Sequence, residues 1–157
     1  QIDSGAYTAS SPALMDGVAY YGTFNNDVLA IDVREQKFLW RYEHPVRHFP
    51  FYSSAAVSND TVVVGGRDKI IHGIERKTGE GFWEFRTGAR VESSPAISRS
   101  RVYIGSADGR LYVLDLTDGT KLWEFNAGAP FVASPALASE RVVIGSQDGV
   151  LYCFGAE

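Results

Sequence analysis

The sequence lacks most of the residues that redox, metal or membrane chemistry would require. Its 157 residues include one cysteine, Cys153, which excludes an intrachain disulfide and any zinc site built on several cysteines. We expect this thiol to pack as a small apolar side chain in a strand. The apolar runs are only a few residues long, whereas a transmembrane helix needs about 20. No stretch is typical of a signal peptide.

An excess of positive charge is also absent. Lysine and arginine total 15 against 19 aspartates and glutamates, which gives a formal net charge of −4. Nucleic-acid binding normally shows as a basic stripe or a basic excess. We therefore expect no nucleic-acid partner.

Strand-forming residues and turn residues are abundant. Short β-branched runs such as "TVVVGG" and "RVVIGS" alternate with turns, and the chain has 16 glycines, 8 tyrosines and 9 phenylalanines. This composition is typical of short strands joined by tight turns and predicts an all-β protein.

A long internal repeat fixes the architecture. The phrase Ser-Pro-Ala, or a variant of it, begins at Ser11, Ser54, Ser94 and Ser134. The tryptophans Trp40, Trp83 and Trp123 follow the same spacing. Each period contains four strand patterns, such as "SSPAIS", "RVYIGS", "RLYVLDL" and "KLWEF", separated by turns of the Asp-Gly or Thr-Gly kind. Four strands in a unit of about 40 residues predict a β-propeller blade, with the tryptophans on its outermost strand, packed between blades.

These repeats resemble the PQQ-like (pyrroloquinoline-quinone-type) β-propeller family, whose signature is Ala-x-Asp-x-x-Thr-Gly-x-x-x-Trp. The matching residues are Ala30, Asp32 and Trp40 in the first copy, Thr78, Gly79 and Trp83 in the second, and Asp115, Gly119 and Trp123 in the third. Residues that depart from the signature are Glu35 and Gln36 in the first copy, Gly73 and Glu75 in the second, and Val113 and Asp118 in the third. The resemblance covers essentially the whole chain and is specific for fold, not for function.

We expect one propeller segment over residues 1–157, built of four-stranded antiparallel blades. The repeat units are 11–53, 54–93, 94–133, and 134–157 completed by 1–10, because "QIDSGAYTASSPAL" aligns with "EFNAGAPFVASPAL". About four blades allow three arrangements. The segment is part of a larger propeller, two chains pair as a homodimer into an eight-bladed ring, or four blades close on themselves. We favour the first two, since four such blades would crowd the inner strands.

The resemblance also raises the question of a quinone cofactor. Quinoprotein dehydrogenases of this family generally carry a vicinal cysteine pair and a metal held by Glu, Asn and Asp. Cys153 is alone here, and Asp32 and Asp115 recur once per unit, as expected of turn residues. We expect no cofactor, no metal and no catalysis.

A break in the repeat marks the candidate binding site. The segment "RYEHPVRHFPFYSSA" is three residues longer than its counterparts and carries His44, Arg47, His48, Phe49 and Phe51. Propeller topology puts it on the same face as the Asp-Gly turns, so that Arg67 and Arg90 are expected near it. Cations beside aromatic side chains favour an acidic peptide or another anionic ligand.

We therefore predict a non-catalytic scaffold for protein–protein interaction, similar to the propeller lipoprotein of the bacterial outer-membrane assembly machine. That resemblance alone favours the cell envelope or periplasm. The alternatives are a fragment of a quinoprotein dehydrogenase, or a ligand-sensing domain attached to a kinase or transporter.

Overall fold

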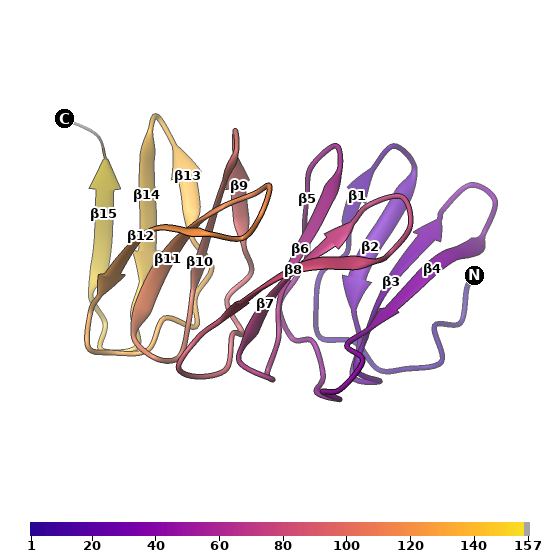
Figure 1. Cartoon of the computed structure of the whole chain (residues 1–157), viewed down its shortest axis with the longest axis horizontal. Coiled ribbons are helices and arrows are strands. Elements are labelled where there is room, and N and C mark those ends of the chain that lie inside the picture. Colours follow the sequence, from indigo (N-terminus) through magenta and orange to yellow (C-terminus); the bar gives the residue numbers. More distant parts are fainter. Residues whose placement is uncertain (156–157) are drawn as a thin grey trace.

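A computed structural model describes residues 1–155 and confirms the all-β propeller fold (Figure 1). Three four-stranded antiparallel sheets and one three-stranded sheet stand side by side. Blade 1 comprises β1 (Ala13–Met15), β2 (Val18–Gly22), β3 (Asp27–Asp32) and β4 (Lys37–Glu43). Blade 2 comprises β5 (Ala56–Val57), β6 (Thr61–Gly65), β7 (Ile70–Glu75) and β8 (Gly81–Arg86). Blade 3 comprises β9 (Ala96–Ser98), β10 (Arg101–Gly105), β11 (Arg110–Asp115) and β12 (Lys121–Asn126), and blade 4 comprises β13 (Ala136–Ala138), β14 (Arg141–Gly145) and β15 (Leu151–Gly155).

Consecutive strands pair within each sheet through the turns that the sequence predicted. The turn before the third strand of each blade needs a residue with positive φ. Glycine fills it at Gly109 and Gly149, and Asn26 and Lys69 fill it in the first two blades. Helices are absent from residues 1–155, so no helix in this part of the chain is long and apolar enough to cross a bilayer.

A ladder of serines links the inner strands of neighbouring blades. The backbone N–H groups of Ser11, Ser54 and Ser94 each donate to the hydroxyl of the serine one unit later, all at 2.9 Å. The recurring serine of the Ser-Pro-Ala phrase and its variant therefore links neighbouring blades just before their innermost strands.

The tryptophans on the outer strands pack against the next blade. Trp40 on β4 donates from Nε1 to the carbonyl of Arg76, and Trp83 on β8 donates to that of Leu116. Their rings lie on Gly79 and Gly119, where an added Cβ would meet the indole at 2.7 and 2.5 Å. Burying such a ring contributes on the order of 3 kcal/mol.

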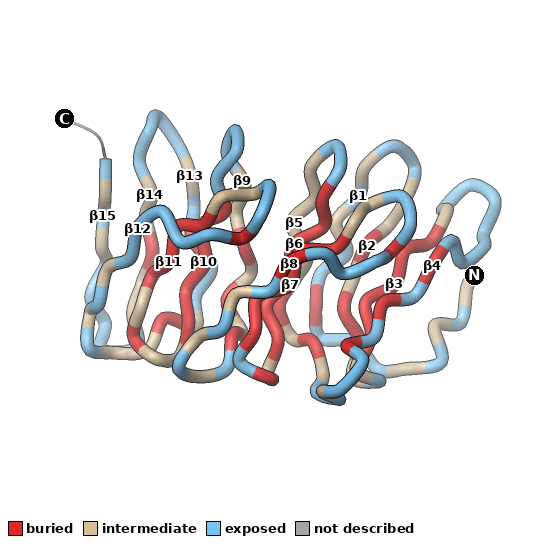
Figure 2. The backbone as a smooth tube through the Cα atoms, in the orientation of Figure 1, coloured by how far each residue is buried: buried red, intermediate tan, exposed pale blue. Residues whose placement is uncertain are grey.

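The outer strand β12 has no buried residue, unlike the outer strands β4 and β8 (Figure 2). Trp123 on β12 is 42% exposed, against 9% for Trp40 and 7% for Trp83. The sheet of blade 4 has three strands, and residues 1–10 do not pair with β15 but lie at the opposite end of the molecule (Figure 1). Asp3 and Gly5 nevertheless form the same turn as Asn126 and Gly128, with N–H to carboxyl or amide oxygen distances of 2.8 and 2.9 Å. Residues 1–10 therefore have the conformation of a link between blades.

Candidate functional site

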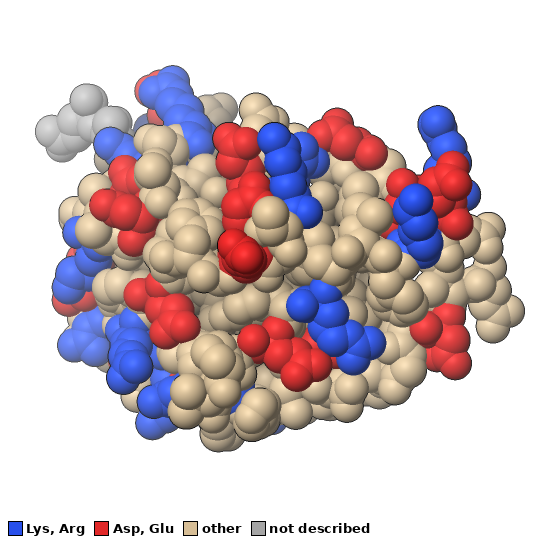
Figure 3. Space-filling view, turned by 45° about the vertical axis from the view of Figure 1, so that its right-hand side comes forward, with Lys and Arg blue, Asp and Glu red and all other residues tan. Residues whose placement is uncertain are grey.

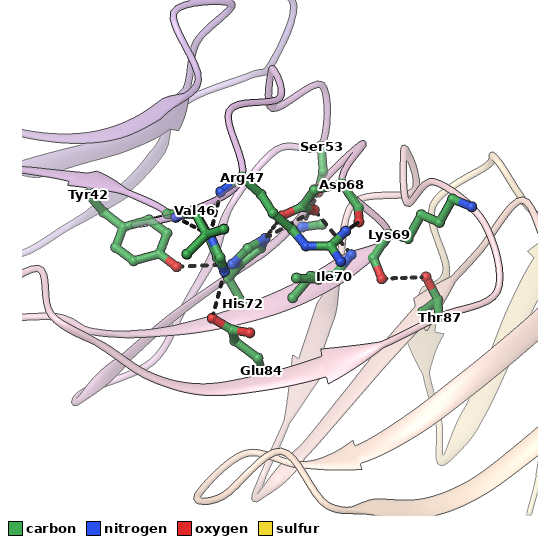
Figure 4. Close-up of polar contacts among 12 residues, drawn as sticks. Tyr42, Val46, Arg47, Ser53, Asp68, Lys69, Ile70, His72, Glu84 and Thr87 are labelled. Atoms are coloured by element: carbon green, nitrogen blue, oxygen red, sulfur yellow. Dashed lines mark hydrogen bonds and ion pairs between the residues drawn. The ribbon is translucent and has the colours of Figure 1, made fainter.

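The candidate site is the segment between β4 and β5, which passes from blade 1 to blade 2. It lies beside the turn between β6 and β7, because the Arg47 guanidinium donates to the carbonyl of Asp68 at 3.0 Å (Figure 4). The sequence predicted this longer segment and its neighbourhood from the break in the repeat.

His44 anchors the start of the segment and is buried. Its Nδ1 accepts hydrogen bonds from the N–H groups of Val46 at 3.1 Å and Arg47 at 2.9 Å. Its Nε2 lies 3.0 Å from Oε1 of Glu84 on β8. Because Nδ1 accepts two N–H groups, the proton of the neutral ring is on Nε2 and is donated to Glu84. His44 therefore fixes the loop backbone and is not available to a partner.

A second histidine, His72 on β7, lies fully buried below the loop. Its Nδ1 is 3.0 Å from the hydroxyl of Tyr42, and its Nε2 is 3.2 Å from Oδ2 of Asp68. An ionised carboxylate only accepts, so Nε2–H donates to Asp68 and Tyr42 donates to Nδ1. Burial raises the pKa of the Tyr42 hydroxyl above its usual value.

The repeat explains this buried network as a variant of a structural pair. In blade 3 the position of His72 is taken by Tyr112, whose hydroxyl donates to Asp108 at 2.7 Å. In blade 2, His72 therefore occupies the position that a tyrosine occupies in blade 3. The hydroxyl that bonds to His72 comes from Tyr42 in blade 1. With no exposed surface, His72 cannot contact a substrate.

The sequence prediction placed one more buried residue on the binding surface. Phe51 is 1% exposed, and it packs so closely on Gly22 that a side-chain Cβ at that glycine would overlap the Cβ of Phe51. Val91 and Phe131 make the equivalent contacts on Gly65 and Gly105. Phe51 is therefore a core residue that recurs in the repeat, and together with His44 it is removed from the candidate contact surface.

The outward side of the segment presents the predicted residues His48 and Phe49, together with Val46, which the sequence prediction did not include. Val46 is 78% exposed and Phe49 is 48% exposed, and His48 beside them is exposed as well. Val46 and Phe49 therefore present apolar surface to solvent beside the exposed His48.

Arg67 and Arg90 lie on the same face and share one carboxylate. Their Nε atoms are 3.0 and 3.1 Å from Oε1 of Glu92. The Arg67 guanidinium carbon also lies 4.5 Å from the ring centroid of Tyr52, the residue that follows Phe51. The sequence prediction missed Tyr52 and Glu92, although they occupy equivalent positions in successive repeat units and differ in chemistry.

The predicted repeat aspartates Asp32 and Asp115 end strands β3 and β11 and bond the turns that follow. Asp32 accepts from the N–H groups of Arg34 and Glu35 at 2.9 and 2.8 Å, and Asp115 accepts from Thr117 at 2.7 Å. Gly79 and Gly119 have φ of +79° and +73°.

A cluster of His, Cys, Asp or Glu side chains that could hold a metal ion is absent from the part of the chain that the structure describes. Cys153 is exposed on β15. On the face shown in Figure 3, acidic and basic side chains are interspersed.

Comparisons with known proteins identify the fold and the family. The chain is similar to the crystal structure of BamB from Moraxella catarrhalis, with 24% identity and a TM-score of 0.86 over 97% of this chain and 51% of that one. It is also similar to the computationally designed Ika4 protein, with 16% identity and a TM-score of 0.84 over 99% and 94% of the two chains. A quinohemoprotein alcohol dehydrogenase from Pseudomonas putida HK5 matches at 19% identity and a TM-score of 0.78, over 92% of this chain and 29% of the enzyme.

The chain thus spans about half the length of the BamB structure. No curated protein matches it. The family model described as outer membrane protein assembly factor BamB matches residues 24–156. The chain belongs to this family of PQQ-like β-propellers.

Proposed function

We propose that this chain is a non-catalytic propeller scaffold that binds a protein partner through the face containing the β4–β5 segment. The supporting observation is the pair of exposed apolar side chains Val46 and Phe49 in one segment, whose backbone the buried His44 fixes at Val46 and Arg47. A fixed loop loses little conformational entropy when a partner binds. Membership of a family named for an assembly factor agrees with this role.

The alternative, a fragment of a quinoprotein dehydrogenase, has less support. The chain is 19% identical in sequence to the alcohol dehydrogenase, and a similarity at this level supports a shared fold only. The buried histidines are bonded within the protein, and Cys153 is single. The family relationship supports a search for the partner in the cell envelope.

The test compares capture of protein partners by matched variants. Val46→Ser with Phe49→Ser removes the apolar surface of the segment. Val33→Ser with Phe82→Ser is the control, because Phe82 on β8 is exposed to the same 48% as Phe49. All three proteins should show the same thermal unfolding.

We expect the wild type and the control to form a stoichiometric complex with a discrete purified partner. The Val46 and Phe49 variant should bind that partner at least tenfold more weakly. Equal binding by all three proteins would contradict the proposal, and so would the lack of any stoichiometric complex.

A further inference from the structure

A continuous row of side chains crosses the face beside the β4–β5 segment. The Tyr7 and Phe24 rings meet edge to face at 4.9 Å between centroids, and Phe24 and Tyr52 lie 4.4 Å apart. Arg67 lies over Tyr52, and Glu92 joins Arg67 to Arg90. The row runs from the link before blade 1 to the link between blades 2 and 3, and we call it the aromatic–arginine row.

The fold requires the backbone of this row but not its side chains. The N–H of Phe24 donates to the carbonyl of Tyr7 at 2.9 Å, and two later units repeat this bond at 3.0 Å between Ala107 and Arg90 and between Gln147 and Pro130. The side chains at these positions change from unit to unit. Equivalent positions hold Phe24, Arg67, Ala107 and Gln147, and also Tyr52, Glu92 and Val132. Since blades 3 and 4 form with Ala, Val, Pro and Gln in these places, the aromatic and cationic residues are not needed for packing.

The row is open to solvent at its aromatic end and cationic at the other. Tyr7 is 73% exposed. Arg67 and Arg90 share the single carboxylate of Glu92. Arg47 donates to the carbonyl oxygen of Asp68, whose carboxylate is buried against His72. Arg67 and Arg90 therefore outnumber the one carboxylate that they contact, which leaves a local excess of positive charge at this end of the row in a chain of net charge −4. A local excess of positive charge on an acidic protein favours the approach of anionic groups at that place.

We propose that the aromatic–arginine row binds an extended acidic segment of the partner protein, with the partner's aromatic or proline side chains on Tyr7, Phe24 and Tyr52. Its carboxylates meet Arg67 and Arg90, which are then shared between Glu92 and the partner. Arginine forms bidentate pairs with carboxylates, and tyrosine and arginine dominate binding energy at protein interfaces. This inference rests on the proposed scaffold function and names the chemistry of the partner.

The test measures fluorescence anisotropy of labelled twelve-residue peptides titrated with the full 157-residue chain. One peptide contains Asp, Phe and Gly. A second has Lys in place of Asp, and a third has Ser in place of Phe. Vesicles with 30% anionic lipid, roughly a physiological surface charge, provide an anionic surface without aromatic side chains.

We expect the Asp and Phe peptide to bind and the other two peptides to bind at least tenfold more weakly. Arg67→Ser and Tyr7→Ser should each weaken its binding about tenfold, and Arg34→Ser, an exposed arginine in the β3–β4 turn, should leave it unchanged. Tyr7 is mostly exposed, so its variant keeps the test informative if Arg67→Ser unfolds. Equal binding of acidic and basic peptides, equal binding of vesicles, or wild-type affinity in both variants would overturn the inference.

The two proposals fail separately. Capture of a partner that depends on Val46 and Phe49, without binding of the acidic peptide, would leave the scaffold function standing and reject the role of the row. Peptide binding that is unaffected by Arg67→Ser, with no captured partner, would reject both.

Discussion

Replacing Gly119 by alanine tests how the blades are held together, and Gly128→Ala is its matched control. Both glycines have positive φ, +73° and +79°, so each alanine costs about 1 kcal/mol for the left-handed backbone. They differ in what the new methyl group meets. At Gly119 it lies 2.5 Å from Cε3 of Trp83, and at Gly128 nothing lies within 4 Å.

A carbon–carbon contact of 2.5 Å is about 1 Å too short, so the Trp83 ring has to move away from blade 3. The ring then loses part of its packing and its hydrogen bond to the Leu116 carbonyl. These losses lower the free energy of unfolding by about 2 kcal/mol more. Complete loss of a buried aromatic ring would lower it by roughly 3–5 kcal/mol. We therefore expect Gly119→Ala to lower the free energy of unfolding by about 3 kcal/mol and Gly128→Ala by about 1 kcal/mol.

Urea unfolding followed by far-ultraviolet circular dichroism measures both losses, and tryptophan emission reports the position of the ring. Gly119→Ala should shift the native emission to longer wavelength, because Trp83 becomes exposed, and Gly128→Ala should not. Equal losses of stability with unchanged emission would refute the view that Trp83 fastens blade 2 to blade 3.

Three further predictions concern the polar network and the loop. His44→Ala removes the acceptor of two loop N–H groups, so trypsin should cleave within residues 45–50 several times faster, as read by mass spectrometry. Burial raises the pKa of the Tyr112 hydroxyl. The stability that the protonated hydroxyl contributes is therefore fully present below about pH 10, the usual tyrosine pKa, and is lost as the pH rises above it. Unfolding free energy should therefore fall less steeply above about pH 10 in Tyr112→Phe than in the wild type, and parallel curves would show that this hydroxyl is not responsible. Asp108→Ala removes three hydrogen bonds, from Gly88, Arg110 and the Tyr112 hydroxyl, and should cost about 2–3 kcal/mol. The same change at exposed Asp148 should cost less than about 1 kcal/mol, and equal costs for the two aspartates would contradict this account.

The repeated parts of the fold could be predicted from the sequence because each recurring residue has the same physical task in every blade. Tryptophan at one position and glycine at another are needed wherever one blade packs on the next, as at Trp40 with Gly79 and at Trp83 with Gly119. The regular spacing of these residues therefore predicted the number of strands and sheets. Regular spacing of this kind indicates which residues make contacts between neighbouring repeat units. It does not indicate which residues contact a partner protein.

The candidate site was predictable only in part. The extra residues of the β4–β5 segment marked its place, but the pattern did not distinguish buried Phe51 from exposed Phe49, since both are aromatic residues in a loop. His44 looked like a surface cation and is a buried backbone anchor. The sequence prediction included Arg67 and Arg90 but missed the aromatic members of the row. Tyr7, Phe24 and Tyr52 come from separate segments, and only the folded chain places them side by side.

Hydrogen–deuterium exchange of the chain, alone and bound to the purified partner, tests most directly whether this face binds a protein. We predict slower exchange on binding in residues 44–52 and 66–69, which form the β4–β5 segment and the adjacent turn. The outer strands β4, β8 and β12 should exchange at unchanged rates. Protection confined to those outer strands, with residues 44–52 unaffected, would contradict the account.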